Sequence, residues 1–255
     1  MLYPIMTPSR LVEDLAGIWD FQLDPEERGF AEKWYEKPLE DPITMPVPAS
    51  FNDLKDGSDF RDYHGWVFYQ RRISLPAFMA KQRVMLRFDA ATHHANVYLN
   101  GRLIAEHQGG FLPFETEISD FLRPGEDNLL TVAINNFIDN TTLPVGMIGN
   151  MLGGNLGASP EPKHPGPNFD FFNYAGLNRT VRIYTTPGQY IADLTVTSQI
   201  DGEDGTRPIA DGGKALLNYT VAVGGQEDQA LADAALVELF DETGVKVAEA
   251  NGLSG

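Results

Sequence analysis

The stretch that decides the fold is ANVYLNGRLIA, residues 95–105. Asn100 and Gly101 stand between two short apolar runs, and an Asn-Gly pair in that position is the strongest short signal for a β-hairpin. The sequence therefore predicts two antiparallel strands that turn at residues 100–101.

Segments on both sides of this hairpin alternate apolar and polar residues, which is typical of half-buried strands. In residues 15–24, for example, Trp19, Phe21 and Leu23 share one face. Residues 43–51 contain two prolines and are predicted to be an edge strand or a loop. Other strands are predicted at 63–75, 83–89, 114–118, 128–134 and 180–184, with one short helix near 119–122. Short strands without a long helical period predict an all-β domain, an antiparallel β-sandwich, over residues 1–187.

The chain changes character after residue 187. Residues 188–255 hold about four predicted strands, at 190–196, 215–223, 235–240 and 245–250, whereas an immunoglobulin-like sandwich needs about seven. This second domain is therefore predicted to be an incomplete immunoglobulin-like β-sandwich.

Composition limits the classes of partner. The 255 residues include 36 acids and 19 Lys or Arg, for a net charge of −17, and no basic cluster stands out. A protein that binds nucleic acids or anionic membranes needs a positively charged surface, so we expect neither as a partner. The chain has no Cys, no apolar run long enough to span a membrane and no signal-peptide pattern at its beginning. We therefore expect a cytoplasmic protein.

The stretch NFDFFNYAGLNR, residues 168–179, says most about function. It places Asp170 among aromatic residues, where a carboxylate is costly to desolvate unless a group such as a sugar hydroxyl hydrogen-bonds to it. Backbone N–H groups at a turn would satisfy the same carboxylate, so a purely structural Asp170 is the alternative. Residues 143–168, which precede it, are rich in Gly, Pro and Met; a loop this long favours a mobile segment beside a site over plain disorder.

Other chemistry finds little support in the residues. We find no convincing pair of carboxylates for glycoside hydrolysis. His93 and His94 are adjacent on a predicted strand and must point to opposite faces, so they cannot both bind one metal ion. Residues 201–205 are acidic and Gly-rich but lack the spacing of an EF-hand loop. No catalytic residue, metal site or cofactor is predicted.

Several blocks of the sequence point to one family. They are residues 15–21, 47–53, 69–71, 86–90, 106–114 and 169–179. Together they resemble the N-terminal sugar-binding domain of glycoside hydrolase family 2, and most closely its β-glucuronidases of bacterial type. The resemblance runs from about residue 2 to residue 187 and is weaker beyond.

The resemblance implies a jelly-roll-like sugar-binding domain, an immunoglobulin-like sandwich and a catalytic (β/α)8 barrel, with β-D-glucuronides as substrates. The family's retaining mechanism uses two Glu on the barrel, one of which follows an Asn. This chain has no Asn-Glu dipeptide and no barrel signature. We therefore expect an amino-terminal fragment that is inactive by itself and forms a homo-oligomer as the full-length enzyme.

One functional residue is implied by the family motif. Asp170 matches the Asp that reaches from the sugar-binding domain towards the substrate in the barrel, although Phe169 stands where a close relative has His. Asn173, Tyr174 and Arg179 also match the motif, and we expect them to hold Asp170 in place through turn geometry, packing and a charge pair.

Two other functions stay open at this point. A free-standing carbohydrate-binding module would use aromatic side chains as platforms, and the candidates are Tyr63, Trp66, Phe171, Phe172 and Tyr174. A structural or oligomerisation role would use the unpaired strand edges of the second domain.

Overall fold

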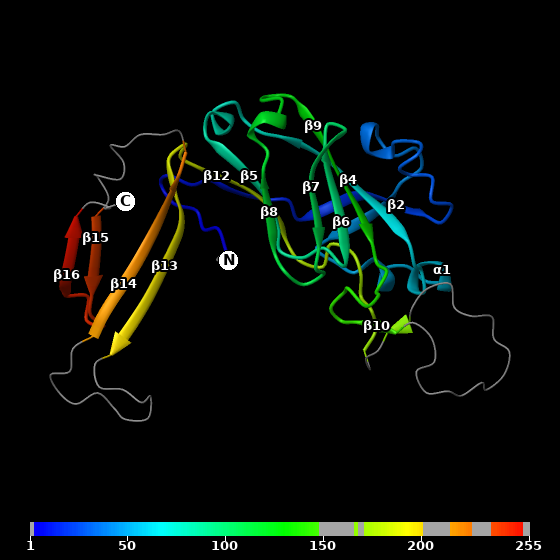
Figure 1. Ribbon diagram of the computed structural model, residues 1–255. Coiled ribbons are helices and arrows are strands. Elements are labelled where there is room, and N and C mark those ends of the chain that lie inside the picture. Colours follow the sequence, from blue (N-terminus) through cyan, green and yellow to red (C-terminus); the bar gives the residue numbers. More distant parts are fainter. Residues whose placement is uncertain (1–2, 148–165, 168–170, 201–214, 226–235, 252–255) are drawn as a thin grey trace. The chain divides into compact units, whose positions relative to one another are not determined.

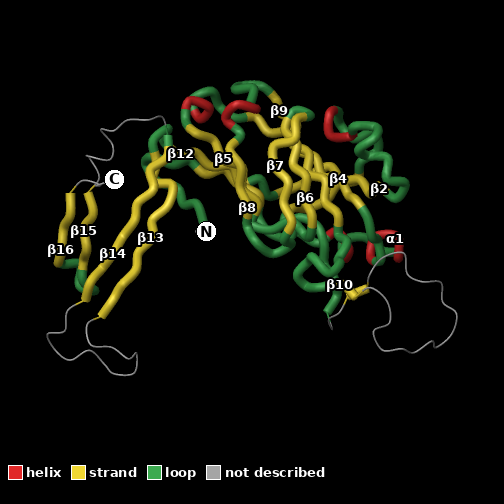
Figure 2. The backbone as a smooth tube through the Cα atoms, in the orientation of Figure 1, coloured by secondary structure: helices red, strands yellow, loops and turns green. Residues whose placement is uncertain are grey.

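The computed structural model describes residues 3–147, 166–167, 171–200, 215–225 and 236–251. The chain divides into two compact units, one ending at Thr186 and the other beginning at Pro187. Strands make up nearly all of the regular structure, and the helices are short turns (Figure 2). The predicted all-β class is confirmed.

The larger sheet of the first unit has six strands in the order β3-β2-β4-β9-β6-β7, all antiparallel (Figure 1). Its strands are β2 (Gly17–Asp24), β3 (Ile43–Val47), β4 (Trp66–Ser74), β6 (His94–Leu99), β7 (Arg102–Gln108) and β9 (Asp127–Asn135). The predicted hairpin is β6–β7, and both turn residues have positive φ, 52° at Asn100 and 81° at Gly101. Pro46 of β3 also fits, because this strand lies at the edge of the sheet and needs fewer N–H donors.

The second sheet has four strands in the order β1-β12-β5-β8. They are β1 (Val12–Asp14), β5 (Arg83–Phe88), β8 (Phe114–Glu117) and β12 (Val181–Thr186). One hydrophobic cluster joins the two sheets, with Phe21 and Tyr69 from the larger sheet and Leu86 and Ile183 from the smaller one, all fully buried. Burying a side chain of this size stabilises a fold by about 1.5 to 3 kcal/mol, so this interior is what makes the two sheets a sandwich.

A second, smaller cluster covers the other face of the six-stranded sheet. Residues 25–41 fold back over β4, and Trp34 and Leu39 pack there against Phe68. The turn begins at the buried carboxylate of Asp24, whose two oxygens accept the N–H groups of Arg28 at 2.8 Å and Gly29 at 2.9 Å. This covering segment was not predicted from the sequence, because it has no strand or helix period.

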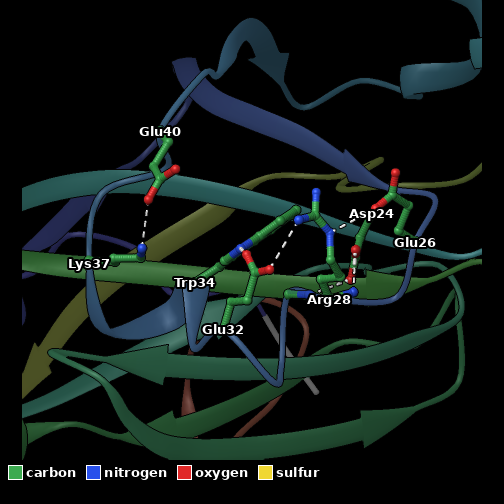
Figure 3. Close-up of polar contacts among 8 residues, drawn as sticks. Asp24, Glu26, Arg28, Glu32, Trp34, Lys37 and Glu40 are labelled. Atoms are coloured by element: carbon green, nitrogen blue, oxygen red, sulfur yellow. Dashed lines mark hydrogen bonds and ion pairs between the residues drawn. The ribbon is translucent and has the colours of Figure 1, made fainter.

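Ion pairs lie along the surface of the covering segment (Figure 3). Arg28 lies between Glu26 and Glu32, and Lys37 contacts Glu40 at 2.7 Å. These side chains are largely exposed, so each pair stabilises the fold only weakly.

The short helices are η1 (Trp34–Glu36), η2 (Phe51–Asp53), α1 (Ser58–Arg61), η3 (Met79–Lys81) and η4 (Ser119–Phe121). The helix predicted near 119–122 is thus confirmed as a 3-10 turn. The strand β1 was not predicted; its three residues are too few to show an alternation.

The segment 143–168 differs from its prediction at its two ends. The sequence shows no strand pattern there, yet β10 (Gly146–Met147) pairs antiparallel with β11 (Gly166–Pro167). Gly146 also packs closely against the chain at residues 138–139, since a Cβ atom at that position would lie 2.6 Å from the carbonyl oxygen of Ile138. The predicted loop itself, residues 148–165, lies outside the described residues.

The second unit contains four described strands, at the positions that the alternation predicts. They are β13 (Tyr190–Ile200) paired with β14 (Ala215–Gly224), and β15 (Leu236–Phe240) paired with β16 (Lys246–Asn251). The immunoglobulin-like assignment and the boundary at residue 187 stay predictions, and the acidic stretch 201–205 lies outside the described residues. In the described part of the chain, no helix has the length and apolar character to cross a bilayer.

Candidate functional site

The described part of the motif, residues 171–179, leads towards β12 and is fixed to the sandwich by backbone hydrogen bonds on two sides. The carbonyl oxygens of Ala175 and Leu177 accept the N–H groups of Phe51 and Ala49, at 3.2 and 2.9 Å. Gly176 faces the other way and exchanges hydrogen bonds with Thr92, at 3.0 and 3.4 Å. The motif therefore runs as a short extended segment between two loops of the sandwich.

Asn173 is held at both ends of its side-chain amide. Its Oδ1 accepts a hydrogen bond from Nε2 of His93 at 2.7 Å, and its Nδ2 donates to the carbonyl oxygen of Asn136 at 3.1 Å. These contacts tie the loop to the residue before β6 and to the residue after β9. That Asn173 holds Asp170 in place stays a prediction.

Asn52 supports the same segment from the opposite side. It is buried, its Oδ1 accepts the N–H of Ala175 at 3.0 Å, and its Nδ2 donates to the carbonyl oxygens of Phe60 and Arg61. Asn52, His93 and Asn136 were not predicted from the sequence to be supports. The only signal for Asn52 was its position in the block 47–53.

Tyr174 contributes chiefly through its backbone and its aromatic face. Its carbonyl oxygen accepts a hydrogen bond from Nδ2 of Asn178 at 3.0 Å, and its ring lies 5.0 Å from that of Phe172. The guanidinium of Arg61, which forms an ion pair with Asp53, lies over the Phe172 ring at 4.2 Å. The loop thus presents aromatic rings together with polar groups.

Arg179 is exposed and donates from Nη1 to the carbonyl oxygen of Phe111 at 3.4 Å. The sequence predicted that it forms a charge pair with Asp170. Asp170 lies outside the described residues, so this pair and the predicted role of Asp170 stay predictions.

Of the other aromatic candidates, Tyr63 and Trp66 are held by contacts within the sandwich, whereas Phe171 is exposed. The Tyr63 hydroxyl donates to the carbonyl oxygen of Trp66 at 2.8 Å and accepts the N–H of Asp24 at 3.1 Å. Trp66 packs edge-on against Phe30 at 4.8 Å. Phe171 is 57% exposed. Among the residues that the structure describes, no three His, Asp or Glu side chains gather as a metal site would require.

His93 is the buried ionisable group of this site. Burial lowers its pKa, an effect that the hydrogen bond to Asn173 partly opposes. The folded chain therefore holds His93 neutral at a pH where the unfolded chain binds a proton, since an ordinary His titrates near pH 6.5. The stability that depends on this group is complete above about pH 6.5 and falls as the pH drops below it.

We expect His93→Ala to lower the free energy of unfolding at pH 7.5 by about 1 to 3 kcal/mol, because it leaves the Asn173 amide oxygen without its donor. The variant should also lose part of the acid sensitivity of the parent below about pH 6.5. Urea denaturation across this pH range measures both effects. His94→Ala is the matched control, because His94 points to the other face of β6 and makes no contact with Asn173; equal losses in the two variants would contradict the assignment.

The comparison with family models decides what this domain is. The sugar binding domain of the glycosyl hydrolases family 2 matches residues 12–187. The chain belongs to glycosyl hydrolase family 2. The resemblance inferred from the motif blocks is thereby confirmed, and the match covers the whole two-sheet sandwich of the first unit.

The similar proteins from a bacterium and from a mammal are both β-glucuronidases. Over its full length the chain is 39% identical to a β-glucuronidase of Paenibacillus borealis and 39% identical to that of Homo sapiens. Among solved structures, a β-glucuronidase of an uncultured Clostridium species matches 99% of the chain with 39% identity and a TM-score of 0.79. A β-glucuronidase of Ruminococcus gnavus matches all of the chain with 37% identity and a TM-score of 0.78. The chain spans about 40% of the length of these proteins.

Proposed function

We propose that this chain is the sugar-binding part of a β-glucuronidase and that it supplies Asp170 as a group that orients the substrate sugar. The observation that carries the proposal is the identity of 39% over the full chain with β-glucuronidases from both a bacterium and a mammal. Catalysis by two Glu would belong to the barrel of the whole enzyme, and this chain would position the substrate through Asp170.

The ligands of a related structure support a uronic substrate. A β-glucuronidase of Ruminococcus gnavus, 38% identical to this chain, is known in complex with D-glucaro 1,5-lactone. A carboxylate such as Asp170 accepts hydrogen bonds from sugar hydroxyls, which are O–H donors. We therefore propose that Asp170 accepts hydrogen bonds from the hydroxyl groups of the sugar. The carboxylate of the sugar would be bound by residues of the barrel.

The anchoring of residues 171–178 gives Asp170 a mechanical basis for this role. Two residues after Phe171, Asn173 is fixed at both ends of its amide, and Ala175 and Gly176 are hydrogen-bonded to the sandwich. A binding group performs best when the residues around it are locked by packing and hydrogen bonds. A rigid support that begins three residues after Asp170, at Asn173, suits an orienting residue.

In the full-length enzyme we expect Asp170→Ala to lower kcat/KM for a chromogenic β-glucuronide about 10- to 150-fold, which corresponds to about 1.5 to 3 kcal/mol for a charged hydrogen bond. Asp170→Asn should lose less, because its amide oxygen still accepts a hydrogen bond. Steady-state kinetics and a thermal melt of each variant separate loss of binding from loss of folding.

Asp41→Ala is the control for this experiment, because Asp41 is an exposed acid on the segment that covers β4. Unchanged kinetics in Asp170→Ala would remove the orienting role. A comparison of the 255-residue chain with the full-length enzyme tests the rest of the proposal, since we expect only the longer protein to hydrolyse the substrate. Homo-oligomer formation and a cytoplasmic location stay predictions.

A further inference from the structure

A pocket of about 560 Å³ opens on the first unit, on the face of the six-stranded sheet that is turned away from the main hydrophobic core. Side chains from β4, β6, β7 and β9 line it, and residues that follow β9 complete it. The described lining includes Trp66, His94, Asn96, Glu106, Asn135 and Asp139. Pockets that bind small molecules have volumes of about 300 to 1,000 Å³, so one or two sugar rings fit this size.

The alternation of the strands places these residues together. In β6, Ala95, Val97 and Leu99 are buried in the core, so His94 and Asn96 project to the opposite face. The pairing then aligns polar partners on that face, because Asn96 lies opposite Glu106 and His94 lies opposite Asn135. The register therefore builds a polar patch from residues that are not adjacent in the sequence.

The pocket and the motif are supported by neighbouring residues on opposite faces. His93 and Asn136 contact Asn173 of the motif, whereas His94 and Asn135 line the pocket. The sequence predicted that His93 and His94 point to opposite faces, and the structure confirms it. Neither His94 nor Asn135 forms the side-chain hydrogen bonds to Asn173 that their neighbours form.

The chemistry of the lining suits a ligand with many hydroxyl groups. Asn96 and Asn135 offer both N–H donors and carbonyl acceptors, and Glu106 offers acceptors only. Oδ1 of Asn135 accepts a hydrogen bond from the N–H of Phe137 at 2.8 Å. Its Nδ2 donates no hydrogen bond to any of the described residues. The indole of Trp66 adds a flat apolar surface beside these groups, which suits the C–H face of a sugar ring.

The charge of the lining selects among such ligands. It contains two carboxylates, Glu106 and Asp139, and none of its described residues is Lys or Arg. Hydrogen bonds from the hydroxyl and the N–H of Thr141 hold the pKa of Asp139 below its usual range, and His94 contributes less. Both acids are thus placed to repel a uronate or a phosphate in a chain whose net charge is already −17.

We propose that this pocket binds a neutral saccharide, with Trp66 against a sugar ring and with Asn96 and Glu106 at its hydroxyl groups. The ligand proposed for this pocket is neutral, whereas the glucuronide that Asp170 is proposed to orient is an anion. Binding here does not depend on a barrel or on the proposed function, so the two proposals can fail separately.

The test is a titration of the 255-residue chain with cellobiose, maltose, sodium D-glucuronate and spermidine, followed by isothermal calorimetry and saturation-transfer NMR. At least one neutral disaccharide should saturate, and glucuronate should bind at least tenfold more weakly. No saturation by either disaccharide up to its solubility limit would overturn the proposal. So would glucuronate or spermidine binding as tightly as the better disaccharide.

Three variants locate the binding. Asn96→Ala and Glu106→Gln should each weaken disaccharide binding at least fivefold, whereas Glu126→Gln, an exposed acid in the turn before β9, should leave it unchanged. Trp66→Ala is a poorer probe, because Trp66 also packs against Phe30 and its loss can unfold the segment that covers β4. Binding that survives in both Asn96→Ala and Glu106→Gln, with a normal thermal melt, would place the saccharide elsewhere and overturn the assignment.

Discussion

Gly176→Ala is expected to lower the free energy of unfolding of the first unit by about 2 to 5 kcal/mol, because it combines backbone strain with a steric clash. Gly176 has a φ of +115°, a conformation that residues with a Cβ rarely adopt. A Cβ atom there would lie 2.4 Å from the hydroxyl oxygen of Tyr69 and 3.3 Å from the carbonyl oxygen of Ala49. Tyr69 is fully buried, so its ring has no room to withdraw. Chemical denaturation followed by tryptophan fluorescence measures the loss.

Two further variants separate strain from clash. Gly57 has a nearly identical φ of +111°, and nothing lies within 4 Å of the position that its Cβ would take. Gly57→Ala should therefore show only the backbone cost, about 1 to 3 kcal/mol. In the background of Tyr69→Phe, which removes the clashing oxygen, Gly176→Ala should cost less than it does in the parent. A Gly176→Ala variant no less stable than Gly57→Ala would show that the motif segment shifts without resistance.

Asp89→Ala is expected to destabilise the first unit by about 3 to 5 kcal/mol, the range for breaking a buried ion pair by removing one partner. Asp89 accepts a hydrogen bond from Nε of Arg87 at 2.8 Å and also forms an ion pair with Arg182. Side chains of Asp89 and Arg87 are only 3% and 2% exposed. The two arginines lie directly opposite each other on β5 and β12, so without Asp89 their like charges face one another. Urea denaturation at neutral pH is the measurement.

Asp89→Asn keeps the shape of the side chain and removes its charge, so most of the loss should persist if the charge is what matters. Glu40→Gln is the exposed control: Glu40 contacts Lys37 at 2.7 Å, but its side chain is 80% exposed, and its loss should leave the unfolding midpoint unchanged. The assignment would be contradicted if Asp89→Asn were as stable as the parent.

Alternation and turn chemistry were enough to predict most of the sandwich. The hairpin at Asn100 and Gly101, the edge position of residues 43–47 and the paired strands after residue 187 all follow from local patterns. The order of the strands does not follow, because β4 pairs with β9 across about sixty residues and no local signal specifies that partner. The covering segment 25–41 has no period at all and is fixed by the buried carboxylate of Asp24 and by packing on Phe68.

The motif itself was visible in the sequence, but its supports were not. His93, Asn136 and Asn52 reach Asn173 and Ala175 from segments that lie between about 37 and 123 residues away in the chain. Single polar residues of this kind occur in many loops, so only the folded arrangement distinguishes them. The pocket on the outer sheet face was missed for the same reason: its residues become neighbours only through the pairing of β6 with β7 and β9.

The short β10–β11 pair has an evolutionary consequence. Because Gly146–Met147 pairs with Gly166–Pro167, the two points at which the chain enters and leaves the interval 148–165 lie side by side. The entropic cost of closing a loop rises only slowly with the length of the loop. Insertions and deletions between two paired strands are therefore tolerated. Natural variation can therefore act on this interval, which leads to Asp170, without changing the sheets that carry the domain.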